Sequence, residues 1–218
     1  MGLASRVPLD RTTETTLLRQ VYLAHFERGE LSLAYDVARR MLDLGVLVDV
    51  CQQDVARVLI ALGDIDKAVE HLRLAASMGT TRRRAFHLWT LGSVLYLAGR
   101  LDEAESVLER AARWATADRA LHEAHLALVR IDNGKVVEGL QDVVACLEGS
   151  TCGQGYGRFV LGMLCIRAGR PEDGEQYLRF FVKGVSERRT ATSLSLSGEL
   201  AAAQKQLQSL ALRSRCAG

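Results

Sequence analysis

The residues best suited to chemistry are His122 and His125, which stand three positions apart in a segment expected to be helical. Two imidazoles at that spacing lie on one face of a helix and could bind a metal ion. No cysteine or carboxylate pair stands at ligand spacing around them, and His25, His71 and His87 are isolated. We therefore expect surface histidines, and we predict no metal site.

The sequence CGQGYG, residues 152–157, superficially resembles a phosphate-binding loop. Such a loop follows a strand and continues into Gly-Lys-Ser/Thr, and neither feature is present. We expect a flexible joint between two helical units. The five cysteines form no CxxC pair, which fits a reducing compartment better than a disulfide framework, and we expect Cys146 and Cys165 to be buried, inert thiols. We predict no cofactor and no enzymatic activity.

Composition places the chain among mostly helical proteins. Of its 218 residues 48% are hydrophobic and 25% charged, and the net charge is +2, which is too balanced to indicate a nucleic-acid or anionic-membrane surface. No stretch approaches the roughly 20 apolar residues of a membrane span, and Met1 to Asp10 lack the apolar core of a signal peptide. We therefore expect a cytoplasmic protein.

The elements that position any site are marked by five glycines at nearly constant spacing. They are separated by 34, 36, 35 and 35 residues, and they are Gly29, Gly63, Gly99, Gly134 and Gly169. A period in this range is typical of a stacked array of helical hairpins. Each glycine can adopt the positive φ that ends the first helix of a hairpin.

Positions measured from each turn glycine have constant character. Seven residues before it the side chain is small in four of five repeats, and five residues after it the side chain is always small. Small residues there allow the two helices of a hairpin to approach closely. Two residues after it stand Leu31, Ile65, Leu101, Val136 and Pro171, where we expect the second helix to begin.

These features resemble the tetratricopeptide repeat family, whose helical hairpin of about 34 residues carries small residues at fixed positions and a glycine in its turn. The matching segments are GELSLAY, GDIDKAV, GRLDEAE, GKVVEGL and GRPEDGE. The resemblance implies an all-α, right-handed α-solenoid of about five hairpins over residues 16–185. An N-terminal tail, residues 1–15, precedes it.

The region 186–218 is expected to close the array. Residues Ser197 to Arg215 have an amphipathic pattern typical of a terminal capping helix. The segment before it has a weaker helical signal and could be a helix or a loop.

A second face of each first helix is defined by the residues 13, 10, 6 and 3 before the turn glycine. In tetratricopeptide repeats this face lines a concave groove, and here fifteen of the twenty positions are apolar or aromatic. Such a surface is typical of a partner site, unless the chain's own termini cover it. The residues that we predict to bind a peptide are Ile60, Phe86, Trp89, Tyr96, Ile131, Tyr156, Phe159, Met163, Ile166 and Arg57.

The expected function is protein binding. Only Arg19 and Arg57 are basic among the twenty groove positions, which argues against a clamp for a C-terminal carboxylate. An apolar peptide or helix of a partner protein is the better ligand for an adaptor or chaperone-like module. The alternative is a structural scaffold that self-associates through its repeat ends or its groove.

Overall fold

The structure, a computed structural model, describes residues 9–216, apart from the side chains of residues 81, 82 and 214–216, so the Cys216 thiol and residues 1–8 of the expected tail lie outside the described part. Within that part the chain forms twelve α-helices, one 3-10 helix and no strand. The α-helices are α1 (Arg11–Glu27), α2 (Leu31–Asp43), α3 (Val48–Leu62), α4 (Ile65–Met78), α5 (Thr81–Leu97), α6 (Leu101–Trp114), α7 (Arg119–Asp132), α8 (Leu140–Glu148), α9 (Gly157–Arg167), α10 (Pro171–Ser186), α11 (Thr190–Ser195) and α12 (Ser197–Cys216). The predicted all-α solenoid is confirmed.

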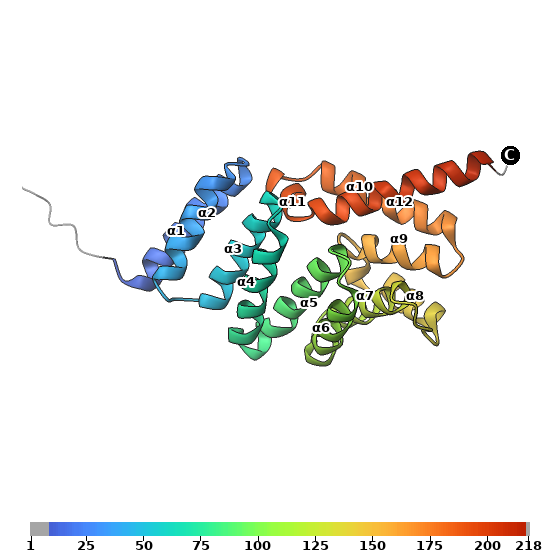
Figure 1. Cartoon of the computed structure of the whole chain (residues 1–218), viewed down its shortest axis with the longest axis horizontal. Coiled ribbons are helices and arrows are strands. Elements are labelled where there is room, and N and C mark those ends of the chain that lie inside the picture. Colours follow the sequence, from blue (N-terminus) through green and yellow to red (C-terminus); the bar gives the residue numbers. More distant parts are fainter. Residues whose placement is uncertain (1–8, 217–218) are drawn as a thin grey trace, which may run out of the picture.

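The helices α1 to α10 pair into five consecutive hairpins that stack along the chain (Figure 1). The first helix of each hairpin packs against its own second helix, and the second helix packs against the next hairpin. Because α1 begins at Arg11, the array starts five residues before the boundary expected from the repeat pattern.

The five turn glycines all have positive φ, between 71° and 83°. At Gly63, for example, the amide donates to the carbonyl of Ile60 and the next amide donates to Leu59, which closes the end of α3. A side chain other than glycine is strained in this conformation. The spacing in the sequence therefore reports a repeated backbone requirement.

Close helix packing explains the small residues of the repeat. In the third hairpin a Cβ on Gly92 would lie 2.5 Å from Leu108 Cγ, and in the fifth a Cβ on Gly162 would lie 2.6 Å from Leu178 Cγ. The equivalent alanines, Ala56 and Ala127, are buried. The predicted contact inside the hairpin is therefore present in these repeats.

The fourth hairpin departs from the expected pattern. Its second helix begins at Leu140 rather than at Val136, which is 93% exposed. Gly139, expected to pack inside the hairpin, precedes the helix with φ 65°. Val136 and Val137 are β-branched and Gly139 follows two residues after them, and these residue types have low helix propensity, so the helix begins after them.

The joint before the fifth hairpin is closely packed rather than open. It contains the 3-10 helix Thr151–Gly153. A Cβ on Gly153 would collide with the Leu147 carbonyl, and one on Gly157 with the Cys152 carbonyl. These glycines therefore allow two backbone segments to approach each other, which differs from the expected flexible joint.

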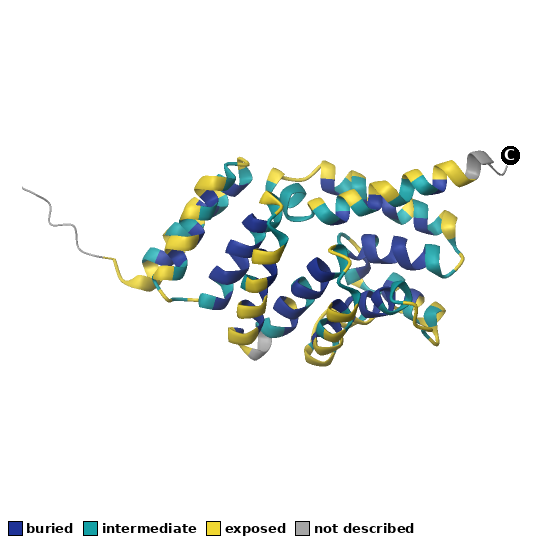
Figure 2. Cartoon of the chain, viewed as in Figure 1, coloured by how far each residue is buried: buried dark blue, intermediate teal, exposed yellow. Residues whose placement is uncertain are grey.

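The helix expected to cap the array is present as α12, which begins at Ser197 and lies along α10 (Figure 1). The segment before it contains a single short helix, α11. Buried residues gather on the helices that face the inside of the array (Figure 2). None of the described helices is long and apolar enough to span a membrane.

Candidate peptide-binding surface

The concave side of the array holds a cavity of about 430 Å³. Helices α3 and α5, the first helices of the second and third hairpins, form one wall. The opposite wall comes from the segment around α11 and the first turn of α12. The lining residues are Gln53, Arg57, Ile60, Ile65, Phe86, Trp89, Thr90, Ser93, Val94, Leu97, Ala98, Tyr156, Arg188, Ser195, Leu196, Gly198 and Glu199.

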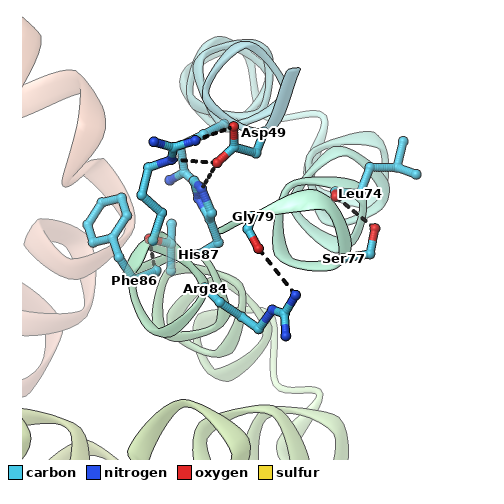
Figure 3. Close-up of polar contacts among 10 residues, drawn as sticks. Asp49, Leu74, Ser77, Gly79, Arg84, Phe86 and His87 are labelled. Atoms are coloured by element: carbon cyan, nitrogen blue, oxygen red, sulfur yellow. Dashed lines mark hydrogen bonds and ion pairs between the residues drawn. The ribbon is translucent and has the colours of Figure 1, made fainter. Parts of the chain in front are cut away.

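Five of the ten predicted binding residues line this cavity, namely Arg57, Ile60, Phe86, Trp89 and Tyr156. They come together because their positions before the turn glycine repeat from hairpin to hairpin and so face one side of the array. Phe86 is the most exposed of them, at 49%. Its ring points toward the ribbon of the C-terminal helices (Figure 3).

The other five predicted residues lie elsewhere. Phe159 and Met163 are 0% and 6% exposed and belong to the hydrophobic core, so they are not available to a partner in this conformation. Tyr96, Ile131 and Ile166 are partly buried against the same core. The reason is that α12 packs on α9 and α10 and covers the concave face of the last hairpins.

The floor of the cavity is polar. The hydroxyl of Ser93 donates to Glu199 Oε1 at 3.0 Å, and that of Tyr156 donates to the same oxygen at 3.2 Å. Burial raises the pKa of Glu199 above its usual value, although both hydroxyls act in the opposite direction. The spacing of the repeats places Ser93 on this face, but no spacing rule predicts that Glu199 lies against it.

Two cations flank the cavity. Arg57 is 30% exposed and its Nη1 lies 3.8 Å from Asp54 Oδ1. Arg188, from the chain between α10 and α11, is exposed. The cavity therefore combines an apolar wall on α3 and α5 with hydroxyl groups at its floor and basic groups at its edges, an arrangement suited to an amphipathic ligand.

Behind the cavity lies a cluster of aromatic rings centred on Trp89. Its ring centroid is 4.6 Å from that of Tyr156, 6.0 Å from His122 and 6.1 Å from His125. The expectation that these histidines are on the surface is wrong, because His122 is 7% and His125 0% exposed. Helix α7 packs between α6 and α9, and the Trp89 ring of α5 covers this face of α7.

The ring nitrogens of the histidines in this cluster have few hydrogen-bond partners. His122 Nδ1 donates to the Asp118 carbonyl at 2.9 Å, whereas both ring nitrogens of His125 and Trp89 Nε1 have no hydrogen-bond partner among the described residues. Burial lowers the pKa of His125 to about 3. The described residues contain no group of three side chains able to hold a metal ion.

A buried polar network fixes α5 against α3. His87 contacts Gln53 through Nδ1 at 3.0 Å and Asp49 through Nε2 at 3.2 Å, while Arg83 donates to Asp49 from Nε at 2.6 Å (Figure 3). Burial alone raises the pKa of Asp49, and the hydrogen bonds from Arg83 and His87 outweigh it, so the pKa lies below its usual value. This network positions Phe86, the residue directly before His87 on α5, at the mouth of the cavity.

Ion pairs one repeat apart join the first helices of neighbouring hairpins. Arg19 Nε lies 2.7 Å from Asp54 Oδ2 across 35 residues, and Arg167 Nε lies 2.9 Å from Asp132 Oδ1, also across 35 residues. Sequence reasoning missed them. The signal was available, because each basic residue stands one period from its acidic partner.

None of the four cysteines whose side chains the structure describes lines the cavity. Burial raises the pKa of the Cys51 and Cys165 thiols to about 11, so both are protonated at neutral pH. The prediction is confirmed for Cys165 but wrong for Cys146, which is exposed. Cys146 lies on the outer side of α8, a helix that begins four residues later than expected.

Comparisons with known proteins agree with the repeated helical hairpins of the structure. The family model for the tetratricopeptide repeat matches residues 56–73 and 85–110, in the second and third hairpins. A search of curated proteins found no match.

Three solved structures share the fold at low identity. The chain is 20% identical to the Pseudomonas aeruginosa protein pilF, with a TM-score of 0.59 over 93% of this chain and 91% of that one. For MamA protein the identity is 17% and the TM-score 0.53, over 79% and 92%. For a putative kinesin light chain from Podospora anserina with TPR-like repeats, the identity is 15% and the TM-score 0.52, over 94% of this chain and 96% of that one. The family model therefore identifies tetratricopeptide repeats in the second and third hairpins, and the same helical-hairpin architecture continues through all five.

Proposed function

We propose that this chain is an adaptor or chaperone-like module that binds an apolar peptide or helix of a partner protein in the concave cavity. Arrays of this fold use their concave surface to hold partners, and the fold implies a protein–protein interaction module in general. The observation that carries the proposal is Phe86, a half-exposed aromatic ring at the mouth of an apolar cavity. Exposed aromatic rings beside a pocket are typical anchors of protein partners.

The lining favours a ligand with apolar side chains and a few polar contacts. Ile60, Ile65 and Leu97 offer apolar surface, while Thr90 and Gln53 offer hydrogen-bonding groups. A volume of about 430 Å³ lies within the usual range for a ligand pocket and could hold a few side chains of one peptide. A short helix or extended segment fits this site better than a fully charged peptide.

Replacement of Phe86 with serine is expected to weaken peptide binding by about tenfold or more, because it removes an aromatic anchor. The probe is a phage-displayed library of random peptides selected on the full-length protein, with the selected peptides then measured by fluorescence anisotropy. The matched control is Phe180→Ser, since Phe180 is 45% exposed but does not line the cavity.

Selected peptides should lose affinity for the Phe86 variant and keep it for the Phe180 variant. A library that yields no binder, or binders indifferent to Phe86, would contradict the proposed site. Circular dichroism of both variants checks that the helices remain folded.

A second candidate function, self-association, is favoured by the N-terminal end of the array. Leu9, Leu17 and Val21 are 54%, 51% and 44% exposed and line an open hollow of about 400 Å³. The residue equivalent to Val21 is buried in each of the four following hairpins. The C-terminal hairpin is covered by α12, whereas no described residue covers this face of the N-terminal hairpin, so a second copy could cover it.

For this candidate we expect the molar mass of the wild type, measured by light scattering, to rise with concentration. The Leu17→Glu variant should stay at the mass of one chain, because a charge on this face opposes its burial. Leu74→Glu is the control, since Leu74 is 43% exposed on α4 and lies outside the hollow. A wild type that keeps the mass of one chain at every concentration would exclude self-association.

A further inference from the structure

The C-terminal segment crosses the concave face of the array. Helix α11 contacts α1 and α3, and helix α12 contacts α5 and α9, so the C-terminal segment touches the first helices of four hairpins. The amide of Thr190 donates to Glu27 Oε1 at 3.0 Å, across 163 residues of sequence. Residues 190–199 therefore occupy the surface on which this fold holds its partners.

The contacts of this segment are those of a bound amphipathic peptide. Ala191 and Leu194, three residues apart, pack against the core of the first hairpins, and Leu196 and Leu200, four apart, pack against the core of the last ones. Spacings of three and four place apolar side chains on one face of a helix. At its end the carboxyl group of Glu199 reaches the hydroxyls of Ser93 and Tyr156.

The segment is held less firmly than the helices beneath it. Helix α11 has six residues, and none of them is fully buried. A helix of that length is not stable by itself and depends on the surface that it touches. Its neighbour Gly198 lies close to Leu97, because a Cβ on Gly198 would stand 3.0 Å from Leu97 Cδ1.

The buried charge of Glu199 gives an electrostatic reason why the segment could leave the concave face. Glu199 is 7% exposed, and the side chains that hydrogen-bond to its carboxyl group in the described structure are two hydroxyls and no cation. Burial of a carboxylate without a cation is unfavourable. Release of the segment would return Glu199 to water and open the hydroxyl pair to another acid.

We propose that residues 190–199 are an intramolecular ligand of the concave face, and that the partner is a short helix of the same chemistry that takes their place. Such a helix carries apolar residues three or four apart, followed by an acidic side chain for the hydroxyls of Ser93 and Tyr156. This inference rests on the proposed function, because it specifies the ligand of the same concave surface, on which residues 190–199 form one wall of the cavity. The ligand enters beside α5 as the C-terminal segment leaves it.

The test uses a fluorescent synthetic peptide with the sequence of residues 187–204 as the probe, added to full-length protein. Leu194→Ser weakens the packing of the resident segment and should increase the affinity for the peptide by about tenfold, since the competing state becomes less populated. Leu212→Ser is the matched control, because Leu212 is 62% exposed on α12 and lies outside the cavity. A second variant, Gly198→Val, should act like Leu194→Ser by crowding Leu97.

A peptide in which the residue equivalent to Glu199 is alanine should bind the Leu194 variant more weakly than the parent peptide does. The inference is overturned if the parent peptide binds neither loosened variant, or binds all proteins equally. Failure of the proposed function is distinguishable, because library-selected peptides that depend on Phe86 would still bind when only the intramolecular ligand is wrong.

Discussion

Replacement of Gly162 with alanine is expected to reduce the free energy of unfolding by about 3 kcal/mol, the scale of a severe overpacking defect. An added Cβ would lie 2.6 Å from Leu178 Cγ and 3.0 Å from the Gly174 carbonyl oxygen. Leu178 is fully buried and the carbonyl belongs to the backbone of α10, so neither can move without separating α9 from α10.

The control for this prediction lies in the same hairpin. Gly184 is inside α10 with open space around its Cα, and its replacement with alanine should stabilise the helix by about 0.5–1 kcal/mol. Guanidinium denaturation of both variants measures the two effects. If the Gly162 variant were as stable as the wild type, the close approach of α9 and α10 would not be a requirement of the fold.

Acid is expected to destabilise the protein through His125. Its pKa is about 3 in the folded state and 6.5 in the unfolded state, because the folded state buries the ring beside His122. The unfolded state therefore binds the proton first, and the stability falls as the pH drops from 6.5 toward 3. Between about pH 7.5 and about pH 4.5 the loss from this one group is about 2.5 kcal/mol.

The variant His125→Leu should lose about 2.5 kcal/mol less than the wild type over the same pH range, because leucine binds no proton. The titratable neighbours that face His125 are His122, Tyr96 and Tyr156, and the two tyrosines stay neutral throughout. Urea denaturation at both pH values measures the difference.

One buried acid acts in the opposite direction. The pKa of Glu199 is raised by burial, so its protonated form favours the folded state at low pH and this contribution is lost as the pH rises above 4.5. Comparison of the wild type with the His125 variant cancels this contribution. Parallel pH profiles for the two proteins would show that His125 is protonated equally in the folded and unfolded states.

The sequence predicts the features that depend on a single repeat or on the contact between two neighbouring repeats. Positive φ at the turn glycines, the small residues inside the hairpins and the concave position of Phe86 all follow from local backbone and steric rules. These rules act within about one period of the chain, and a spacing pattern detects them.

The predictions that are wrong concern residues whose burial depends on segments far away in the sequence. Phe159 and Met163 satisfy the spacing rule for the concave face, but the C-terminal helix packs over that end of the array and buries them. His122 and His125 are polar, yet α7 lies between two hairpins that close around it. The spacing of the repeats carries no information about where α12 packs. The burial of these residues therefore could not be predicted from that spacing.

The hydrogen bond between Thr190 and Glu27, together with the contacts of α11 on α1 and α3, also changes how the molecule should unfold. A linear array of repeats gains stability only from nearest neighbours, and its terminal units can open independently. Here the first hairpin and the segment after the last one hold each other, so opening at either end costs contacts at both. We therefore expect the first hairpin and the segment after the last one to unfold together rather than independently.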